Sequence, residues 1–261
     1  KIENLEKTNG VTVGREELEY IELCASCFNI STSNPDKTID IVDRSMSIAE
    51  MMGDTVVSRK HVERIFLSNF KKFDLLSPEA KRYIAYHEVG HFIIAKLYSD
   101  VLVDRQVLLI SIVPGFDFLG INIFEDTDVH PITSLEYMKA VIAVDIAGGI
   151  SERYFCSRLT TGISQDMINA TNIARNIVMN YSLTENEFSN LYLFDDSGEK
   201  NFPISDTAVD RVNFLAKKLI DDIAIKVEFM LKRNEKIVNE ITKKVLEKKI
   251  VLSSEFDELF K

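Results

Sequence analysis

Two histidines four residues apart, His87 and His91, flank a glutamate in the sequence His-Glu-Val-Gly-His. On an α-helix, residues four apart lie one above the other on the same face, so both imidazoles reach one metal ion. Glu88 points about 100° away around the helix and stays out of the ligand set. A zinc ion lowers the pKa of a water molecule toward neutrality, and a neighbouring carboxylate takes the proton from that water. The motif therefore predicts hydrolysis, with His87 and His91 as zinc ligands and Glu88 as the general base.

A less specific interpretation of the same residues is a buried helix with two hydrogen-bonded core histidines. The apolar neighbours Ile84, Val89 and Phe92 do predict that this helix is buried. They do not account for Glu88, because a glutamate is rarely buried without a partner. We therefore favour the metal site.

A hydrolytic zinc ion takes a third protein ligand and keeps its fourth position open. The chain has two further histidines: His61, in a predicted helical unit near the N-terminus, and His130, next to Pro131 in a predicted turn. Neither has the setting of a ligand. Spacing alone leaves the third ligand open among the many aspartates and glutamates.

The motif lies on a helix with a well-defined start. Ser77 is a good N-cap, Pro78 suits the first helical position, and Glu79 adds a negative charge to the first turn. We expect this helix to continue to about residue 99. After it, residues 107–113 form a β-branched and leucine-rich run, and residues 119–124 alternate apolar with polar side chains, so the two predict a pair of strands.

Helices are expected over most of the remaining chain. Towards the C-terminus they are predicted at residues 134–157, 166–182 and 235–248, with an irregular stretch at 184–204. Between that stretch and the last helix, an apolar stripe from Val209 to Met230 predicts a long amphipathic helix. Near the N-terminus, residues 13–68 predict a small helical unit: a helix over 15–29, a turn at 31–35, a second helix that ends near Gly53, and a third that begins at Ser58. Residues 71–76 are expected to join this unit to the rest.

Composition excludes several classes of protein. Hydrophobic residues make up 46% of the 261 residues, as in an ordinary globular protein, and the net charge of -10 argues against a nucleic-acid partner. Three cysteines do not make a disulfide framework, and Cys24 and Cys27 are expected to be small buried residues of a helix. We find neither a signal-peptide start nor an apolar run of about 20 residues. The first residue is Lys1, so we expect a fragment of a longer protein.

Two separate segments resemble the FtsH family of ATP-dependent zinc proteases. Residues 83–91, Tyr-Ile-Ala-Tyr-His-Glu-Val-Gly-His, resemble that family's active-site helix. Residues 160–167, Thr-Thr-Gly-Ile-Ser-Gln-Asp-Met, are similar to its T-T-G-A-S-N-D-[LI] segment. The family's third zinc ligand is the aspartate of this segment, so the resemblance implies that Asp166 completes the site.

Further likeness covers about residues 78–250. Residues 146–152 are similar to the family's L-[AG]-G-R-x-A-E stretch, although Gly149 replaces its usual arginine and Arg153 its second glutamate. Residues 206–213 resemble the start of its long C-terminal helix. The two departures affect local packing and salt bridges and leave the metal site unchanged.

The N-terminal unit resembles a different family. Residues 34–43, Asn-Pro-Asp-Lys-Thr-Ile-Asp-Ile-Val-Asp, are similar to a segment in the helical lid of Clp-type AAA+ ATPases. The G-x-x-x-x-G-K-[ST] loop that binds nucleotide phosphates does not occur in the 261 residues. The resemblance therefore implies a lid whose ATPase core is absent from this chain, and no nucleotide-binding residue is predicted in it.

The sequence as a whole predicts a mainly α protein: an AAA+ lid-like helical subdomain at residues 1–70, then a helical zincin-type peptidase domain with a small β-hairpin or sheet at 71–261. We expect a cytoplasmic zinc endopeptidase for unfolded or tagged proteins, with an anchor to the cytoplasmic face of the membrane left open. Gly120, Ile121, Asn122 and Ile123 are the candidate strand for binding substrate. The resemblance implies a homohexamer, with ATP acting only through the missing core. Two alternatives stay open: a non-catalytic adaptor with a structural zinc, and a peptidase independent of ATP.

Overall fold

The computed structural model describes residues 1–28, 36–115, 118–126, 134–179 and 206–260. The predicted turn at 31–35, His130 and the predicted irregular stretch at 184–204 lie outside these residues. None of the described helices is both long and apolar enough to cross a membrane.

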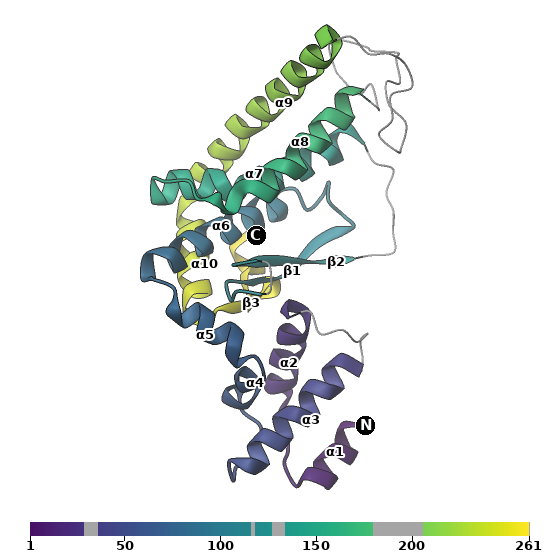
Figure 1. Ribbon diagram of the computed structural model, residues 1–261, viewed down its shortest axis with the longest axis vertical. Helices are drawn as coiled ribbons and strands as arrows, with labels where there is room; N and C mark the ends of the chain where they lie inside the picture. The colour runs from purple at the N-terminus through teal and green to yellow at the C-terminus, as the bar shows by residue number, and fades with distance from the viewer. Residues whose placement is uncertain (29–35, 116–117, 127–133, 180–205, 261) are drawn as a thin grey trace.

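Helices dominate, and a small sheet lies between two groups of them (Figure 1). The N-terminal group and its extension contain α1 (Ile2–Asn9), α2 (Arg15–Cys27), α3 (Asp36–Met51), α4 (Arg59–Ile65) and α5 (Leu67–Leu75). The second group contains α6 (Pro78–Leu97), α7 (Leu135–Cys156), α8 (Ser164–Met179), α9 (Asp206–Arg233) and α10 (Glu235–Lys248). The prediction of a mainly α protein with a small sheet is confirmed.

The sheet is antiparallel, in the order β2-β1-β3, and consists of β1 (Arg105–Ser111), β2 (Ile121–Asp126) and β3 (Ile250–Leu252). In the described part of the chain β2 pairs only with β1, so β2 is an edge strand. Asn122 lies opposite Ile110 in this pairing. The predicted strand pair is therefore confirmed, and β3 is an addition that we did not expect.

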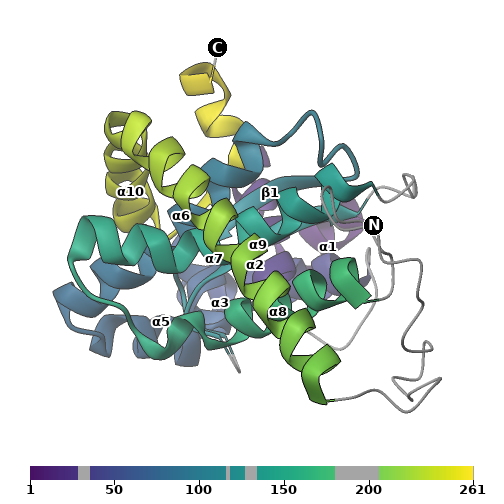
Figure 2. The same cartoon turned by 90° about the horizontal axis from the view of Figure 1, so that it is seen from above.

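Helix α6 is the centre of the second group. It begins as predicted: the Ser77 hydroxyl accepts a hydrogen bond from the Ala80 amide, and Pro78 occupies the first turn. Every residue from 85 to 95 is buried. Such a helix is covered on all sides, by α7, α10 and the sheet. Figure 2 shows α7, α8 and α9 together, and these three pack against one another.

Helices α6 and α7 approach closely at Gly90. A Cβ atom there would lie 2.6 Å from the Ser151 Cβ and 2.7 Å from the Ala147 carbonyl oxygen. Only a glycine fits at this contact between the two backbones. The glycine inside the His-Glu-Val-Gly-His motif thus allows α7 to lie directly against the two histidines.

Some elements were not predicted. Most of residues 71–76, which were expected to join the N-terminal unit to the rest, belong to the helix α5, whose Phe70 and Phe73 are buried. Helix α1 and the final 3-10 helix η2 (Ser253–Phe260) were not predicted at all. Cys24 and Cys27 are buried residues of the helix α2, as expected, and both are free thiols in the structure.

Candidate metal centre

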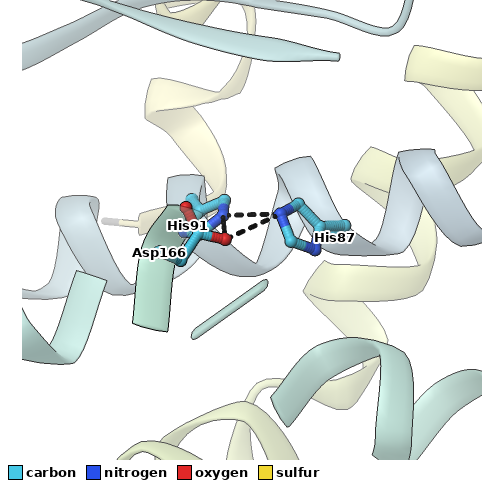
Figure 3. A group of neighbouring side chains, drawn as sticks. All are labelled: His87, His91 and Asp166. Atoms are coloured by element: carbon cyan, nitrogen blue, oxygen red, sulfur yellow. Dashed lines mark hydrogen bonds and ion pairs between the residues drawn. The ribbon is translucent and has the colours of Figure 1, made fainter. Parts of the chain in front are cut away.

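Three side chains from two helices converge on one point (Figure 3). His87 and His91 extend from the same face of α6, and their Nε2 atoms are 3.0 Å apart. Asp166 comes from the first turn of α8, with Oδ2 3.2 Å from the His87 Nε2 and 3.5 Å from the His91 Nε2. Among the described residues this is the one group of His, Cys, Asp or Glu side chains with the spacing of a metal site.

Hydrogen bonds at the Nδ1 atoms of the two histidines determine which nitrogen of each imidazole carries the proton. The His87 Nδ1 is 2.8 Å from the Glu152 Oε1, and the His91 Nδ1 is 2.6 Å from the Val144 carbonyl oxygen. Both partners accept hydrogen bonds, so each Nδ1 carries a proton. In the neutral imidazoles both Nε2 atoms then present lone pairs to each other and to the Asp166 carboxylate. Three electron-rich atoms this close require a cation between them.

The distances fit a zinc ion. Ligand atoms about 2.0–2.1 Å from a tetrahedral zinc ion lie about 3.3–3.4 Å from one another. The three separations here are 3.0, 3.2 and 3.5 Å. The Asp166 Oδ2 is also buried and, apart from the two histidines, accepts no hydrogen bond from the described residues. Two imidazoles and one carboxylate are the ligand set of a zinc hydrolase, with one position left for water.

Without a metal, a proton takes the place of the cation. Burial lowers the pKa of His87, but the Asp166 and Glu152 carboxylates outweigh this effect and raise the pKa to about 10. Burial raises the pKa of Asp166, but the hydrogen bonds and charges of the two histidines lower it by more. The pKa of Asp166 therefore lies well below its usual range. A cluster that holds a proton so firmly has a strong affinity for positive charge.

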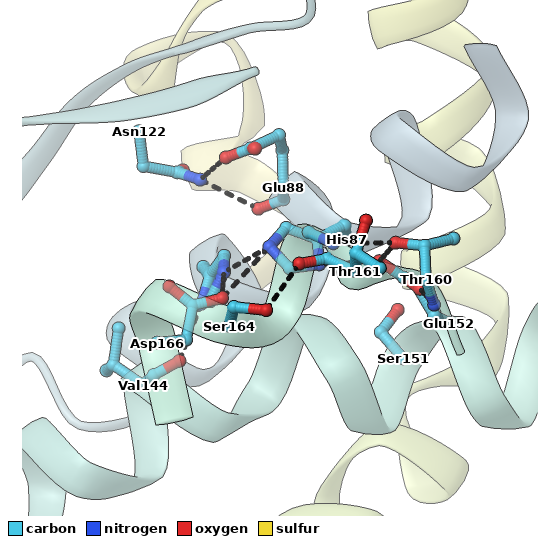
Figure 4. A network of polar contacts seen from close by, with 12 residues as sticks. His87, Glu88, Asn122, Val144, Ser151, Glu152, Thr160, Thr161, Ser164 and Asp166 are labelled. Atoms are coloured by element: carbon cyan, nitrogen blue, oxygen red, sulfur yellow. Dashed lines mark hydrogen bonds and ion pairs between the residues drawn. The ribbon is translucent and has the colours of Figure 1, made fainter. Parts of the chain in front are cut away.

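A network behind the histidines joins α6, α7 and the start of α8 (Figure 4). Besides its contact with His87, the Glu152 carboxylate accepts hydrogen bonds from the Thr160 backbone amide and hydroxyl, at 2.8 and 3.1 Å. The Thr160 hydroxyl in turn accepts from the Gly162 amide and caps the short helix η1 (Thr161–Ile163), which leads into α8. Glu152 therefore orients one candidate ligand, His87, and anchors the segment that leads to another, Asp166.

Glu88 lies beside the three candidate ligands and outside the group that they form. Its side chain is buried and points toward β2, where the Asn122 amide donates to its Oε2 at 2.7 Å. Burial raises the pKa of Glu88, and the neighbouring His87 and His91 and the Asn122 amide act in the opposite direction. A carboxylate held in this way has the position expected for a base beside the metal.

Most of the predicted site residues lie together. The structure brings His87, His91 and Asp166 within bonding distance of one cation and places Gly120 and Asn122 against Glu88. His61 lies elsewhere: it is fully buried, its Nε2 is 2.9 Å from the Asp54 Oδ2, and its Nδ1 accepts from the Ser58 amide. It is a core histidine with both ring nitrogens hydrogen-bonded.

Sequence reasoning gave no role to Glu152, the Val144 carbonyl or Gly148. A Cβ at Gly148 would lie 2.5 Å from the His91 Nε2 and 2.6 Å from the His87 Cε1. Glu152 and Gly148 lie in the stretch 146–152 that resembles the FtsH family, so the resemblance marked the region without revealing what these residues contact.

Comparison with known families decides the assignment. The model of "Peptidase family M41" matches residues 74–259. The chain belongs to peptidase family M41. Its relatives carry the name ATP-dependent zinc metalloprotease FtsH. The protein from Clostridium perfringens is 31% identical over 207 residues, which are 76% of this chain and 28% of that protein. FtsH 4 from Synechocystis sp. is 26% identical over 210 residues, 77% of this chain and 33% of that protein.

The M41 match covers α6 to η2 and so contains the whole candidate metal centre. The resemblance to the peptidase part of the FtsH family is confirmed. This chain spans about a third of the length of the curated relatives that it matches. The likeness of residues 34–43 to a Clp-type lid stays a prediction.

Proposed function

We propose that this chain is the zinc-dependent endopeptidase part of an ATP-driven protease and hydrolyses peptide bonds of unfolded polypeptides. The observation that carries the proposal is the convergence of the lone pairs of His87, His91 and Asp166 on one point beside the buried Glu88. A zinc ion bound there supplies an open coordination position and a water molecule of lowered pKa.

The chain's own residues then do three things. The neutral rings of His87 and His91 carry no proton on Nε2, because Glu152 and the Val144 carbonyl oxygen accept a hydrogen bond from the proton on each Nδ1. Glu88 takes the proton of the attacking water and delivers a proton to the departing amine. The side chains of His87, Glu88 and His91 are buried, which shields them from bulk water.

The edge strand β2 is the proposed site for the substrate backbone. An extended peptide pairs with an unpaired strand edge through main-chain hydrogen bonds, which makes binding tolerant of sequence. Residues Gly120 to Ile123 lie at the start of β2, next to Glu88. Binding of this kind suits unfolded chains, because a folded protein rarely offers an extended segment.

Other parts of the proposal concern the longer protein. Residues 1–70 are proposed to act as an AAA+ lid and residues 71–261 as the peptidase domain, within a homohexameric ring driven by an ATPase core outside this chain. The names of the relatives support ATP dependence. The alternative of a non-catalytic module with a structural zinc leaves Glu88 without a purpose, because a structural site needs no buried carboxylate beside its ligands.

The test compares casein hydrolysis by the zinc-loaded chain and by Glu88→Gln at equal zinc content. We expect Glu88→Gln to retain zinc and to lose activity by about two to four orders of magnitude, because an amide cannot accept the proton. The matched control is Glu63→Gln, which changes a glutamate bonded to Tyr20 in the N-terminal group and leaves the rate unchanged. A Glu88→Gln variant that digests casein at the wild-type rate would exclude Glu88 as the base.

A further inference from the structure

The Glu88 carboxylate is held from outside its own helix, by strand β2. The Asn122 Nδ2 lies 3.0 Å from the Glu88 carbonyl oxygen and 2.7 Å from the Glu88 Oε2 (Figure 4). A carboxamide nitrogen carries two hydrogens, so both donors of Asn122 are used on this one residue. The bond to the backbone anchors the amide on α6, and the bond to the carboxylate fixes the side chain.

Gly120 completes the seat for this carboxylate. Gly120 lies immediately before β2, and its Cβ direction points at Glu88 on α6, as the Asn122 side chain does. A Cβ at Gly120 would lie 2.7 Å from the Glu88 Oε1 and 2.7 Å from its Cγ. One carboxylate oxygen therefore contacts the Asn122 amide while the other lies against the bare backbone of Gly120.

We propose that Asn122 is a positioning residue that holds the Glu88 carboxylate at the metal centre. The inference rests on the proposed function and deepens it. The strand proposed to bind substrate also sets the position of the base. The Asn122 side chain contacts Glu88, and within the described residues β1 is the one strand that pairs with β2. A glutamate has three side-chain torsions, and a base displaced by about 1 Å loses about 100-fold in rate.

Kinetics separate positioning from substrate binding. We expect Asn122→Ala to lower kcat on a fluorogenic peptide by about 10- to 100-fold, as is usual for the loss of an orienting partner, and to leave KM and zinc content unchanged. Asn122→Asp has the same shape but offers no donor and adds a negative charge facing Glu88, so it should be at least as slow as Asn122→Ala. If Asn122 only filled space, Asn122→Asp would keep the wild-type kcat, because the two side chains have the same shape.

The effect must also depend on Glu88. In the Glu88→Gln background, Asn122→Ala should lower kcat no further, because residues that act as a unit are not additive. The control is Asn69→Ala, which removes a comparable amide bond, to the Pro114 carbonyl oxygen at 2.8 Å, far from Glu88 along the chain. Three results would each overturn the proposal: an equal lowering of kcat by Asn122→Ala in both backgrounds, a raised KM with unchanged kcat, or a wild-type rate.

A second measurement does not need activity. Urea unfolding of the metal-free wild type, Asn122→Ala, Glu88→Ala and the double variant forms a double-mutant cycle. We expect the midpoint shift of the double variant to be smaller than the sum of the two single shifts; additive shifts would refute the Asn122–Glu88 contact. Asn122→Ser replaces Asn122→Ala if circular dichroism shows that the latter does not fold. An inactive wild type with coupled midpoints would reject the proposed function alone.

Discussion

Gly148→Ala should abolish tight zinc binding without unfolding the chain. The added methyl group would lie 2.5 Å from the His91 Nε2, 2.6 Å from the His87 Cε1 and 2.8 Å from the His87 Nδ1. An ordinary contact of this kind is at least 3.4 Å, so both imidazoles must retreat by about 0.8–0.9 Å. Bonds to a metal tolerate deviations of about 0.2 Å. The substitution therefore displaces both ligands by about four times that tolerance.

The fold itself should not suffer. Gly148 lies inside α7, where alanine is favoured over glycine by about 1 kcal/mol of helix propensity. Zinc affinity, in contrast, should fall at least about 100-fold, because displacing two ligands exceeds the usual cost of losing an outer partner. We would measure zinc affinity by competition with a chromophoric chelator and secondary structure by circular dichroism.

The neighbouring glycine is the matched control. A Cβ at Gly149 would meet the Ile163 Cγ2 at 2.9 Å, and this is the end of a side chain that can rotate away. Gly149→Ala should therefore bind zinc as the wild type does. Equal zinc affinity in Gly148→Ala and Gly149→Ala would refute the geometry on which the candidate metal centre is built.

Three further predictions concern the metal and the substrate. His91→Ala and Asp166→Ala should each lose most bound zinc, because two ligands rarely hold it, and full retention in both, measured by metal analysis, would reject the ligand set. Zinc affinity should rise about tenfold per pH unit between about pH 7 and 9, because zinc must displace the proton of His87, whose pKa is raised to about 10; an affinity independent of pH would contradict this. Casein should be degraded and a stable folded domain should survive, with or without ATP, in an assay of both substrates; loss of the folded domain on addition of ATP would be the contrary result.

The same His87 proton affects the stability of the metal-free chain. Its pKa in the folded state is above the ordinary value of about 6.5, so the protonated ring stabilises the fold fully below about pH 6.5. This contribution is lost as the pH rises toward 10. Zinc reverses the trend, since it binds the neutral ring.

Short sequence patterns correctly predicted those features of the fold and the site that depend only on residues close together in the chain. The start of α6 at Ser77 and Pro78, and the common face of His87 and His91, follow from helix geometry alone. Asp166 lies far along the chain on α8, and no periodicity links it to α6. The resemblance to a known family was therefore needed to select it from the other carboxylates.

The elements that sequence reasoning missed are held by distant contacts. Strand β3 is three residues long, and its pairing of Leu252 with Leu109 has no local signal. In α5, Phe70 and Phe73 form a buried apolar face, but Lys71 and Lys72 lie between them in the sequence and interrupt the apolar pattern. The contacts of Gly148 and Glu152 with the histidines also depend on the packing of α7 against α6, which a single sequence does not reveal.

The most direct test of the metal centre is the X-ray absorption spectrum of the zinc-loaded chain at the zinc edge. We predict four nitrogen or oxygen neighbours at about 2.0–2.1 Å, with the multiple scattering of two imidazoles. Asp166→Ala should change this shell or lose the metal. A sulfur neighbour at about 2.3 Å would instead place zinc on cysteine, such as Cys24 or Cys27, and would contradict the assignment of His87, His91 and Asp166.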